Sequence, residues 1–472
     1  MIQLPHLSIE SVPSVQNVFE TRDGRYENPD GKVAEGLPPI TFAELTLSPA
    51  PTSHIRVEIA LPEPGAWNGR LVGCGNGGGA GGLPTEAIAD RARQGYAAVT
   101  TDLGTAPVPK LAGIDNPEVW RDYGHRATHL MFVAAKQAVR AAYGRAPSFT
   151  YFTGGSTGGQ QGLSLAQRHP EDCDGILAGV PAHCRAPLHA YFLWNWQATH
   201  RPDGAPLFTK EQEESYRAVV LELLSNRETF PHARGRFLAE PRWDAALRAE
   251  AIRRAAARDP SLTPAHLDAL RRLQDGPVHA RTGERIFDGL PPATDFQPAC
   301  DNLYLIHWIF GEDADLMRID FDRDIDRYFA ALAPDLNAEN PDLDAFRARG
   351  GKLLMYSGTA DSCVPYTATL DYYERVVERL GGDFDAVQDF FLYYLLPGRK
   401  HNGGPGVQGI KNDFRLLVDW REKGIRPQAT GFACTTPTFQ VPLYPYPQTT
   451  APDGSPAPFP RGGVARVAER FR

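Results

Sequence analysis

A serine set between closely spaced glycines is the residue best placed for chemistry in this chain. The run GGSTG at 154–158 follows a β-rich stretch at 149–152 and precedes a helical pattern that starts near Gly159. Strand, sharp turn and helix around Gly-x-Ser-x-Gly are typical of a nucleophile elbow. The hydroxyl of Ser156 would then project at a helix N-terminus, where amide N–H groups favour developing negative charge. The alternative is an ordinary glycine-rich turn, since the chain has 45 glycines; the context favours Ser156 as a nucleophile.

A serine hydroxyl becomes a good nucleophile only with two partners. An imidazole must take its proton, and a carboxylate must hold that imidazole in the correct tautomer. Asp361 and His401 each follow a predicted buried strand, and ligands of open parallel sheets bind at the carboxyl ends of the strands. The order Ser, Asp, His also matches that of hydrolases with this elbow. We therefore predict a triad of Ser156, Asp361 and His401. Three other acids compete less well because they precede or open a strand: Asp383, Asp385 and Asp389.

A glycine-rich loop at 73–82 offers backbone amides for the same site. It follows a predicted strand at 70–74 and has neither G-K-[ST] nor G-x-G-x-x-G with a later acidic partner, so it is not a phosphate loop. In serine hydrolases of this topology, a loop after an early strand supplies one oxyanion N–H, beside the N–H that follows the nucleophile. The alternative interpretation is a flexible surface linker.

The elements that position these residues alternate between strand and helix patterns. Strands are predicted at 40–47, 54–61, 70–74, 96–101, 149–152, 176–180, 352–357 and 389–396, and helices at 85–94, 125–143, 210–224, 242–258, 263–273 and 407–423. Such alternation indicates an α/β fold with a mainly parallel sheet covered on both faces. Residues 182–345 are charged, aromatic and largely helical. We expect residues 1–181 and 346–472 to form the catalytic domain and 182–345 an inserted lid. The rest of 1–50 and the tail at 425–463 are expected to be irregular.

Composition excludes several classes of partner. The chain has 472 residues and a net charge of −8, which argues against nucleic acid. The first residues do not show the basic stretch followed by an apolar stretch that a secretory signal has. No apolar run is long enough to span a membrane. Six cysteines without metal spacing are expected to be reduced: Cys74, Cys173, Cys184, Cys300, Cys363 and Cys434. Provided the native N-terminus is present, we expect a cytoplasmic protein that acts on a small molecule without cofactor or metal.

Taken together, the motifs resemble the tannase and feruloyl esterase family of α/β-hydrolases, which includes the hydrolase of mono(hydroxyethyl) terephthalate. The matching stretches are GNGGGAGG, FTGGSTGGQQGLSLAQRHPEDCDGILAGVPA, KLLMYSGTADSCVPYTATLDYYERV and PGRKHNGGPG, within about residues 55 to 425. The resemblance implies an α/β-hydrolase fold, with Ser156 as nucleophile, Asp361 as acid and His401 as base. It implies an oxyanion hole from the N–H of Thr157 and that of Gly77 or Gly78. It also implies hydrolysis of an aromatic or phenolic ester through an acyl-enzyme, with 182–345 as the lid.

The chain departs from the family pattern at two places. Most members carry a disulfide between the serine and histidine loops, but the corresponding positions here are Gly155 and Asn402. We expect tight glycine packing and a hydrogen bond from the Asn402 side chain to hold the histidine loop instead. Typical lids also hold calcium in a loop dense in Asp and Gly, and 200–260 contains no such run. Both departures fit a cytosolic enzyme. The densest acidic cluster is interpreted as a solvated face: Asp320, Asp322, Asp324 and Asp326.

Aromatic residues of the inserted segment are candidates for an apolar substrate pocket, although core packing explains most of them equally well. They are Tyr191, Phe192, Trp194, Trp196, Trp308 and Phe310. Two alternatives to ester hydrolysis stay open. The same triad could transfer the acyl group to another alcohol, or the chain could be a non-catalytic binding protein on a hydrolase fold. The intact set of Ser, Asp and His favours an enzyme.

Overall fold

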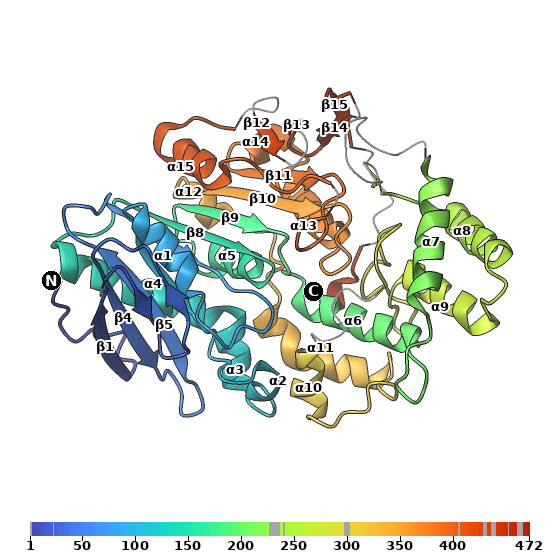
Figure 1. The fold of residues 1–472 in the computed structure, drawn as a ribbon, viewed down its shortest axis with the longest axis horizontal. Coiled ribbons are helices and arrows are strands. Elements are labelled where there is room, and N and C mark those ends of the chain that lie inside the picture. Colours follow the sequence, from blue (N-terminus) through green and yellow to red (C-terminus); the bar gives the residue numbers. More distant parts are fainter. Residues whose placement is uncertain are drawn as a thin grey trace.

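A nine-stranded β-sheet forms the centre of the molecule in the computed structural model (Figure 1). The structure describes residues 2–21, 23–225, 237–238, 241–296, 303–404, 406–427, 432–435, 440–451, 453–459 and 466–472. The strand order is β1 (Ser14–Glu20), β4 (Ile40–Leu47), β5 (Ile55–Pro62), β7 (Ala97–Thr101), β6 (Arg70–Cys74), β8 (Phe149–Gly155), β9 (Gly175–Gly179), β10 (Lys352–Gly358) and β11 (Phe391–Leu396). The last six strands are parallel to one another, and the first three form antiparallel pairs. The predicted α/β class is confirmed.

The parallel half of the sheet brings the predicted site segments to one edge. The chain leaves β8 into the GGSTG run, leaves β10 towards Asp361 and leaves β11 towards His401. Because β8, β9, β10 and β11 are neighbours in that order, their carboxyl ends lie side by side. Open α/β sheets bind their ligands at this edge.

Helices cover both faces of the sheet. One face packs against α4 (Ala127–Tyr143), α5 (Thr157–Arg168) and α13 (Tyr366–Arg379), and the other against α1 (Thr85–Arg93) and α15 (Asp413–Lys423). Within β7, Ala97 and Val99 belong to the first core and Ala98 to the second. This alternation is the two-residue period of a strand, and it shows why the central strands consist of continuous apolar runs.

Among its described residues, the 182–345 segment adds helices and no strand to the sheet. Its helices are α6 (Arg185–Thr199), α7 (Lys210–Leu223), α8 (Ala245–Arg258), α9 (Pro264–Asp275), α10 (Tyr304–Phe310) and α11 (Arg323–Leu336), and α12 (Asp344–Ala348) crosses its C-terminal boundary. Helix α6 contacts α9, α10 and α11, and α10 also contacts α2 (Pro109–Ala112) outside the segment. In Figure 1, α7, α8 and α9 lie on the side of the molecule opposite β1.

Three elements differ from the sequence predictions. The edge strand β1 is not predicted from the sequence. Most of its residues are exposed, so the sequence shows no sustained alternation there. The helix predicted at 407–423 begins only at Asp413: Val407 N–H donates to Pro397 O, and Asn412 adopts a left-handed conformation with φ 57°. The tail holds four short strands: β12 (Phe432–Thr435), β13 (Gln440–Leu443), β14 (Gln448–Thr450) and β15 (Pro456–Pro458).

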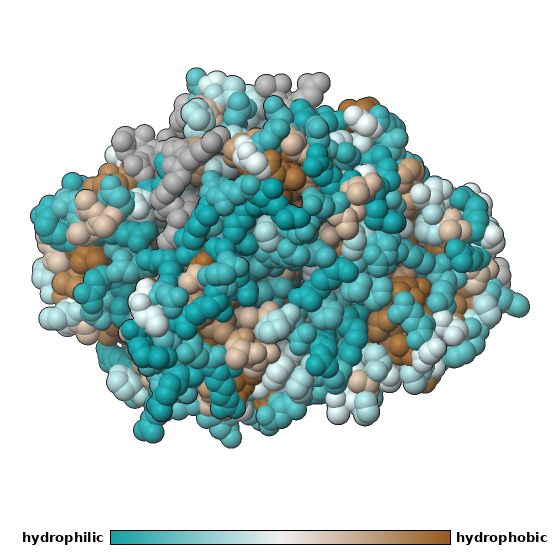
Figure 2. All heavy atoms as spheres, turned by 180° about the vertical axis from the view of Figure 1, so that it is seen from behind, coloured by the Kyte–Doolittle hydropathy of each residue, from teal (hydrophilic) through white to brown (hydrophobic). Residues whose placement is uncertain are grey.

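Several short elements complete the fold. They are the hairpin of β2 (Tyr26–Glu27) and β3 (Val33–Ala34), α3 (Pro117–Arg121), a π-helical turn (Asp122–Arg126) that leads into α4, α14 (Phe384–Gln388) and a final 3-10 turn (Glu469–Phe471). The face shown in Figure 2 is mainly hydrophilic, with hydrophobic residues in small separate groups. No helix in the described part of the chain has the length and apolar character to cross a bilayer.

Candidate active site

Ser156 lies in a sharp turn between β8 and α5. Its backbone has φ 59° and ψ −116°, a conformation that costs a residue with a side chain on the order of 1–3 kcal/mol. Hydrogen bonds hold it from both sides: Ser156 N–H donates to Gly179 O at 2.9 Å, and Ser156 O accepts from Ala182 N–H at 3.0 Å. The residue is half-buried. Strain at one serine between strand and helix is the form that a nucleophile elbow takes.

The outer glycines of the motif are required by the close approach of β8 and α5. A Cβ atom at Gly154 would lie 2.7 Å from Cα of Gly158, and one at Gly158 would lie 3.2 Å from Asn76 O. Side chains there would push strand, helix and glycine loop apart. Gly155 is different, because the nearest atom to a Cβ there is Gly179 O at 3.6 Å, an ordinary contact. Position 155 therefore has room for a side chain without straining the elbow.

The glycine-rich loop after β6 is tied directly to the elbow. Gly158 N–H donates to Asn76 O at 2.8 Å, and Asn76 N–H donates to Gln161 Oε1 at 2.9 Å. Thr157 Oγ1 donates to Gly78 O at 2.5 Å. These bonds hold the loop against the first turn of α5, which a flexible surface linker would not do.

Backbone N–H groups beside the elbow are available to an oxyanion. The N–H of Thr157 stands in the first turn of α5, where amides have no intrahelical acceptor. Among the described residues, neither this N–H nor that of Gly77 or Gly78 donates a hydrogen bond. The positive end of α5 adds to their preference for negative charge. The structure thus places all three predicted oxyanion residues around the elbow with unused donors.

His401 and Asp361 form a hydrogen-bonded pair beyond β11 and β10. His401 Nδ1 lies 2.8 Å from Asp361 Oδ2, and the aspartate is fully buried. Asp361 Oδ1 accepts from the backbone N–H groups of Cys363 at 2.9 Å and Val364 at 2.8 Å. These donors orient an accepting carboxylate, so the proton between the two side chains belongs on His401 Nδ1. His401 Nε2 then carries the lone pair that a general base needs.

The structure brings the three predicted residues to one edge but joins only two of them. Ser156 Oγ makes no hydrogen bond to any described residue, His401 included. Such bonds are often long in a free enzyme and tighten when substrate binds. The contact between Ser156 and His401 therefore stays a prediction for the complex.

The His401 loop is held by hydrogen bonds for which the sequence has no signal. Lys400 and Gly403 exchange backbone N–H···O bonds of 2.5 and 3.3 Å across the histidine. The side chain of Gln408 donates from Nε2 to Gly404 O at 2.5 Å and to Gly406 O at 2.7 Å. One glutamine thus holds together the glycine run that follows His401.

The prediction that the Asn402 side chain holds this loop is wrong. Asn402 is exposed and makes no side-chain hydrogen bond to a described residue, because the side chain points into solvent and Gln408 serves the loop carbonyls instead. Four cysteines are free thiols: Cys74, Cys173, Cys184 and Cys363. Cys300 and the side chain of Cys434 lie outside the described residues.

A cavity of about 320 Å³ borders the Asp361 and His401 loops. The hydrolase core lines it with Thr359, Ala360 and Lys400, and the 182–345 segment lines it with Arg217, Leu221, Phe237, Leu238, Pro241, Pro292 and Ala293. Asp295 joins the two sides: its carboxylate pairs with Lys400 Nζ at 2.6 Å and with Arg217 Nη1 at 3.1 Å. The cavity is mainly apolar, and cationic groups lie at its boundary.

The predicted aromatic pocket is not formed by the residues that were proposed for it. Phe192 and Trp308 are buried in the core, and Trp308 packs edge-on against Tyr123. Trp194 lies under the guanidinium of Arg272, and Trp196 stacks on the ring of His200. None of the four rings lines the 320 Å³ cavity, because packing within the helical segment already uses their surfaces.

Two clusters among the described residues contain several possible metal ligands. In the first, His279 Nδ1 accepts from Thr282 N–H at 3.2 Å, so the neutral ring carries its proton on Nε2. That nitrogen faces Asp322 and Asp326 at 3.5 and 3.4 Å, and both carboxylates also pair with Arg281. In this arrangement Nε2 presents a proton to the two carboxylates, whose charge Arg281 already pairs with. The interpretation of the acidic cluster at 320–326 as a purely solvated face is wrong, since Asp322 and Asp326 are half-buried and paired.

The second cluster combines His129, His169 and Glu171. The two imidazole rings stack at 3.9 Å with 12° between their planes, so their in-plane lone pairs do not converge on one point. His129 Nδ1 lies 2.7 Å from Asp172 Oδ2. Burial, and then the neighbouring charge of His129, lowers the pKa of His169 to about 4. Two stacked imidazoles, one of them bonded to Asp172, explain this cluster.

Four residues beside the elbow were not predicted: Tyr123, Gln160, Arg185 and Tyr304. They come from the π-helical turn, α5, α6 and α10 and meet behind Thr157 and Gly78. No motif marks them, because their shared location arises only when distant parts of the chain pack together.

The chain matches the family model described as tannase and feruloyl esterase over residues 44–312 and 301–456. It is 29% identical to an uncharacterized esterase of Xanthomonas campestris pv. campestris, with 93% of this chain and 86% of the relative covered. It is 26% identical to feruloyl esterase B of Aspergillus niger, over 81% of this chain and 77% of that protein.

Solved structures show the same fold at low identity. Feruloyl esterase B from Aspergillus oryzae superposes with a TM-score of 0.77 at 19% identity, covering 92% of this chain and 93% of its own. Tannin acyl hydrolase from Aspergillus niger superposes with a TM-score of 0.70 at 17% identity, covering 99% and 95%.

Proposed function

Since the chain belongs to the tannase and feruloyl esterase family and is a carboxylic ester hydrolase, we propose that it cleaves an aromatic or phenolic ester through Ser156, His401 and Asp361. The observation that carries this proposal is the hydrogen-bonded pair of His401 and Asp361 on the edge where β8 ends in the strained turn of Ser156. The family relation favours an enzyme over the non-catalytic binding protein considered from the sequence.

In the proposed reaction, Ser156 Oγ attacks the ester carbonyl carbon while His401 Nε2 takes its proton. Asp361 stabilises the imidazolium through the bond to Nδ1, and the N–H groups of Thr157 and of Gly77 or Gly78 bind the oxyanion. The bond to the alcohol oxygen then breaks, and His401 gives its proton to that oxygen. Water attacks the acyl-Ser156, gives a proton to His401, and the carboxylic acid leaves as the serine recovers its hydrogen.

The substrate class is supported by the family and by the cavity beside the catalytic loops. A volume of about 320 Å³ is within the range of small-molecule sites, and its apolar walls suit an aromatic ring. The segment 182–345 closes that cavity from one side, as a lid would.

The test is substitution of each triad residue, assayed with 4-nitrophenyl acetate. We expect Ser156→Ala and His401→Ala to lower kcat by about 10⁵-fold or more and Asp361→Asn by about 10⁴-fold, because the three groups act as one unit. A fluorophosphonate probe should label the wild type and not Ser156→Ala. Methyl ester product in added methanol would reveal acyl transfer by the same serine.

Ser164→Ala is the matched control, since Ser164 is a buried serine on the same helix α5. It should keep wild-type kcat. Near-normal turnover by a folded Ser156→Ala protein would disprove the mechanism.

A further inference from the structure

Arg185, the first residue of α6, is a buried cation in an unfavourable place. The residue is 3% exposed. It occupies a helix N-terminus, where the macrodipole favours anions and disfavours cations. Among the described residues it forms no ion pair; its partners are neutral oxygens. Burial of an unpaired charge is expensive, and a local violation of this kind is expected at functional sites.

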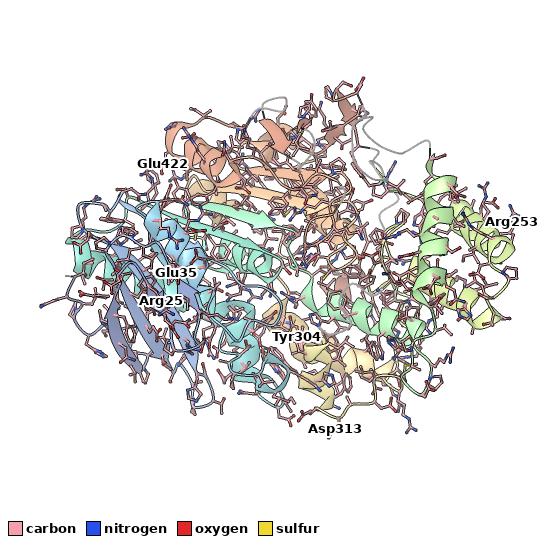
Figure 3. The ribbon with its side chains drawn as sticks, in the orientation of Figure 1. Arg25, Glu35, Arg253, Tyr304, Asp313 and Glu422 are labelled. Carbon is pink, nitrogen blue, oxygen red and sulfur yellow. The ribbon has the colours of Figure 1, made fainter. Side chains whose placement is uncertain are left out.

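Three hydrogen bonds surround the guanidinium. Its Nε donates to Gln160 Oε1 at 2.8 Å, its Nη2 to Thr157 Oγ1 at 2.8 Å and its Nη1 to Tyr304 Oη at 3.3 Å. Gln160 and Thr157 belong to the first turn of α5, directly after Ser156. Tyr304 begins α10 and is labelled near the centre of the molecule in Figure 3. Arg185 thus connects the elbow to two helices of the 182–345 segment.

The same groups converge on one carbonyl of the glycine loop. Gly78 O accepts from Thr157 Oγ1 at 2.5 Å, from Tyr123 Oη at 2.8 Å and from Tyr304 Oη at 3.2 Å. Because Thr157 Oγ1 gives its hydrogen to Gly78, it can only accept from Arg185. The arginine therefore holds, from its accepting side, the hydroxyl whose hydrogen joins both walls of the proposed oxyanion hole.

The charge of Arg185 also acts beyond its direct contacts. Burial, and next the charge of Arg185, keeps the pKa of His189 well below its ordinary value, so this fully buried imidazole one turn along α6 stays neutral. No carboxylate in contact with Arg185 offsets its field among the described residues. Where water is excluded, a fixed positive charge stabilises a nearby anion more strongly than it does in water.

We propose that Arg185 is a positioning residue for the oxyanion hole: it holds Thr157 and Gly78 together, and its charge favours the tetrahedral oxyanion over the neutral ester. The inference rests on the proposed function, since an oxyanion arises only if Ser156 attacks an ester. Arg185 itself does not reach the reacting atoms. An arginine that only supported folding would change the affinity for charged and neutral ligands alike.

The experiment compares wild type with Arg185→Met, Arg185→Gln and Arg185→Lys. It measures kcat and KM for 4-nitrophenyl acetate and the inhibition constants of two probes. Phenylboronic acid forms a negatively charged tetrahedral adduct with an active serine, whereas N-(4-nitrophenyl)acetamide is a neutral analogue of the ester. In Arg185→Met we expect kcat and boronic acid affinity to fall about 100-fold, with KM and amide affinity within about threefold of wild type. Arg185→Lys should recover about tenfold of both losses.

Arg168→Met is the matched control, because Arg168 stands at the other end of α5 and donates to Pro334 O at 2.9 Å. It should leave kcat and both inhibition constants unchanged. The proposal is overturned if folded Arg185→Met keeps wild-type kcat and boronic acid affinity, or if both probes weaken by the same factor.

If Arg185→Met does not fold, the other two variants decide. The lysine variant must then bind phenylboronic acid more tightly than the glutamine variant, and equal affinities overturn the proposal. Failure of the proposed function is distinguishable, since it would appear as wild-type turnover in Ser156→Ala or as no boronic acid inhibition of the wild type.

Discussion

At the scale of single residues, the protein places several ionisable groups where water does not reach them. Arg185 beside the elbow is one, and Glu58 on β5 is another. Glu58 is fully buried and accepts a hydrogen bond from Thr85 Oγ1 at 2.8 Å. Burial raises the pKa of its carboxyl to about 7. Unlike Arg185, Glu58 can become neutral by taking up a proton. The free energy of unfolding should therefore depend on pH.

Stability should therefore decline as pH rises through neutrality. A carboxyl whose pKa is higher in the folded chain than in the unfolded chain adds stability that is complete below the unfolded value and is lost as pH rises through the folded value. Between pH 5 and pH 8, Glu58 should lower the free energy of unfolding by up to about 3 kcal/mol. Glu58→Gln removes this titration, so the Tm of the variant relative to wild type should be higher at pH 8 than at pH 5.

The control for this prediction is Glu20→Gln, which changes an exposed carboxylate on the edge strand β1. Its Tm should follow that of wild type across the same pH range. A Tm difference between wild type and Glu58→Gln that is constant with pH would contradict the burial argument.

At the scale of elements, the serine loop and the histidine loop are each held by hydrogen bonds, without a covalent bridge between Gly155 and Asn402. The first turn of α5 is bonded to the glycine loop, and the loop after β11 is closed by Gln408 and by the backbone pair of Lys400 and Gly403. Each of these bonds is local and replaceable. The position of His401 should therefore depend on a few side chains that can be tested singly.

Gln408→Leu should lower kcat about tenfold, because a loosened loop displaces His401 from its position. The fold should persist, since only two loop hydrogen bonds are lost. Gln388→Leu is the matched control: its amide donates to Tyr446 O at 3.0 Å, away from the catalytic loops, and the variant should keep wild-type kcat.

A crosslink should compensate for this loss. Gly155 has room for a Cβ and Asn402 is exposed, so a cysteine pair at these positions should form a disulfide if their Cα atoms lie within ~7 Å. Added to Gln408→Leu, the oxidised pair should restore kcat, and reductant should reverse the gain. Wild-type activity should not respond to millimolar reductant. Failure of the pair to oxidise, or inactivation of the wild type by reductant, would refute the assigned equivalence of Gly155 and Asn402.

At the scale of the whole molecule, the 182–345 segment and the hydrolase core share the site. Arg185 of the segment reaches Thr157 in the elbow, Tyr304 reaches Gly78 in the glycine loop, and Asp295 pairs with Lys400 beside His401. The segment therefore supports the loops of Ser156 and His401 as well as enclosing the cavity. Its own packing, including the half-buried acids near His279, should need no bound ion.

Chelator should consequently leave Tm and kcat unchanged. Asp322 and Asp326 pair with Arg281, and Asp326 pairs also with Arg470, so two guanidinium groups balance the two carboxylates. Asp326→Asn should lower Tm by the same amount with and without chelator. A Tm that falls in EDTA and recovers with added calcium would show that an ion contributes to this segment.

The sequence by itself determined the local features of this protein. The outer glycines around Ser156 follow from the steric demand of a strand–helix turn, and the continuous apolar runs follow from burial on both faces of a parallel sheet. Periodicity located the strands that precede Asp361 and His401, and their order predicted one shared edge. Such features depend on neighbours within a few residues, so a linear pattern carries them.

Only the tertiary structure decided which distant side chains meet behind that edge. Arg185, Tyr123 and Tyr304 gather on Thr157 and Gly78 because four separate elements pack there, and no spacing in the chain encodes this. The same limit explains the error at Trp308, whose ring is buried by packing between distant elements. The error at Asn402 is local: Gln408 binds Gly404 and Gly406 within its own loop, and the sequence has no signal for which of the two amide side chains does so. Contacts between residues far apart in sequence depend on how whole helices and strands pack together, and a local sequence pattern does not determine that packing.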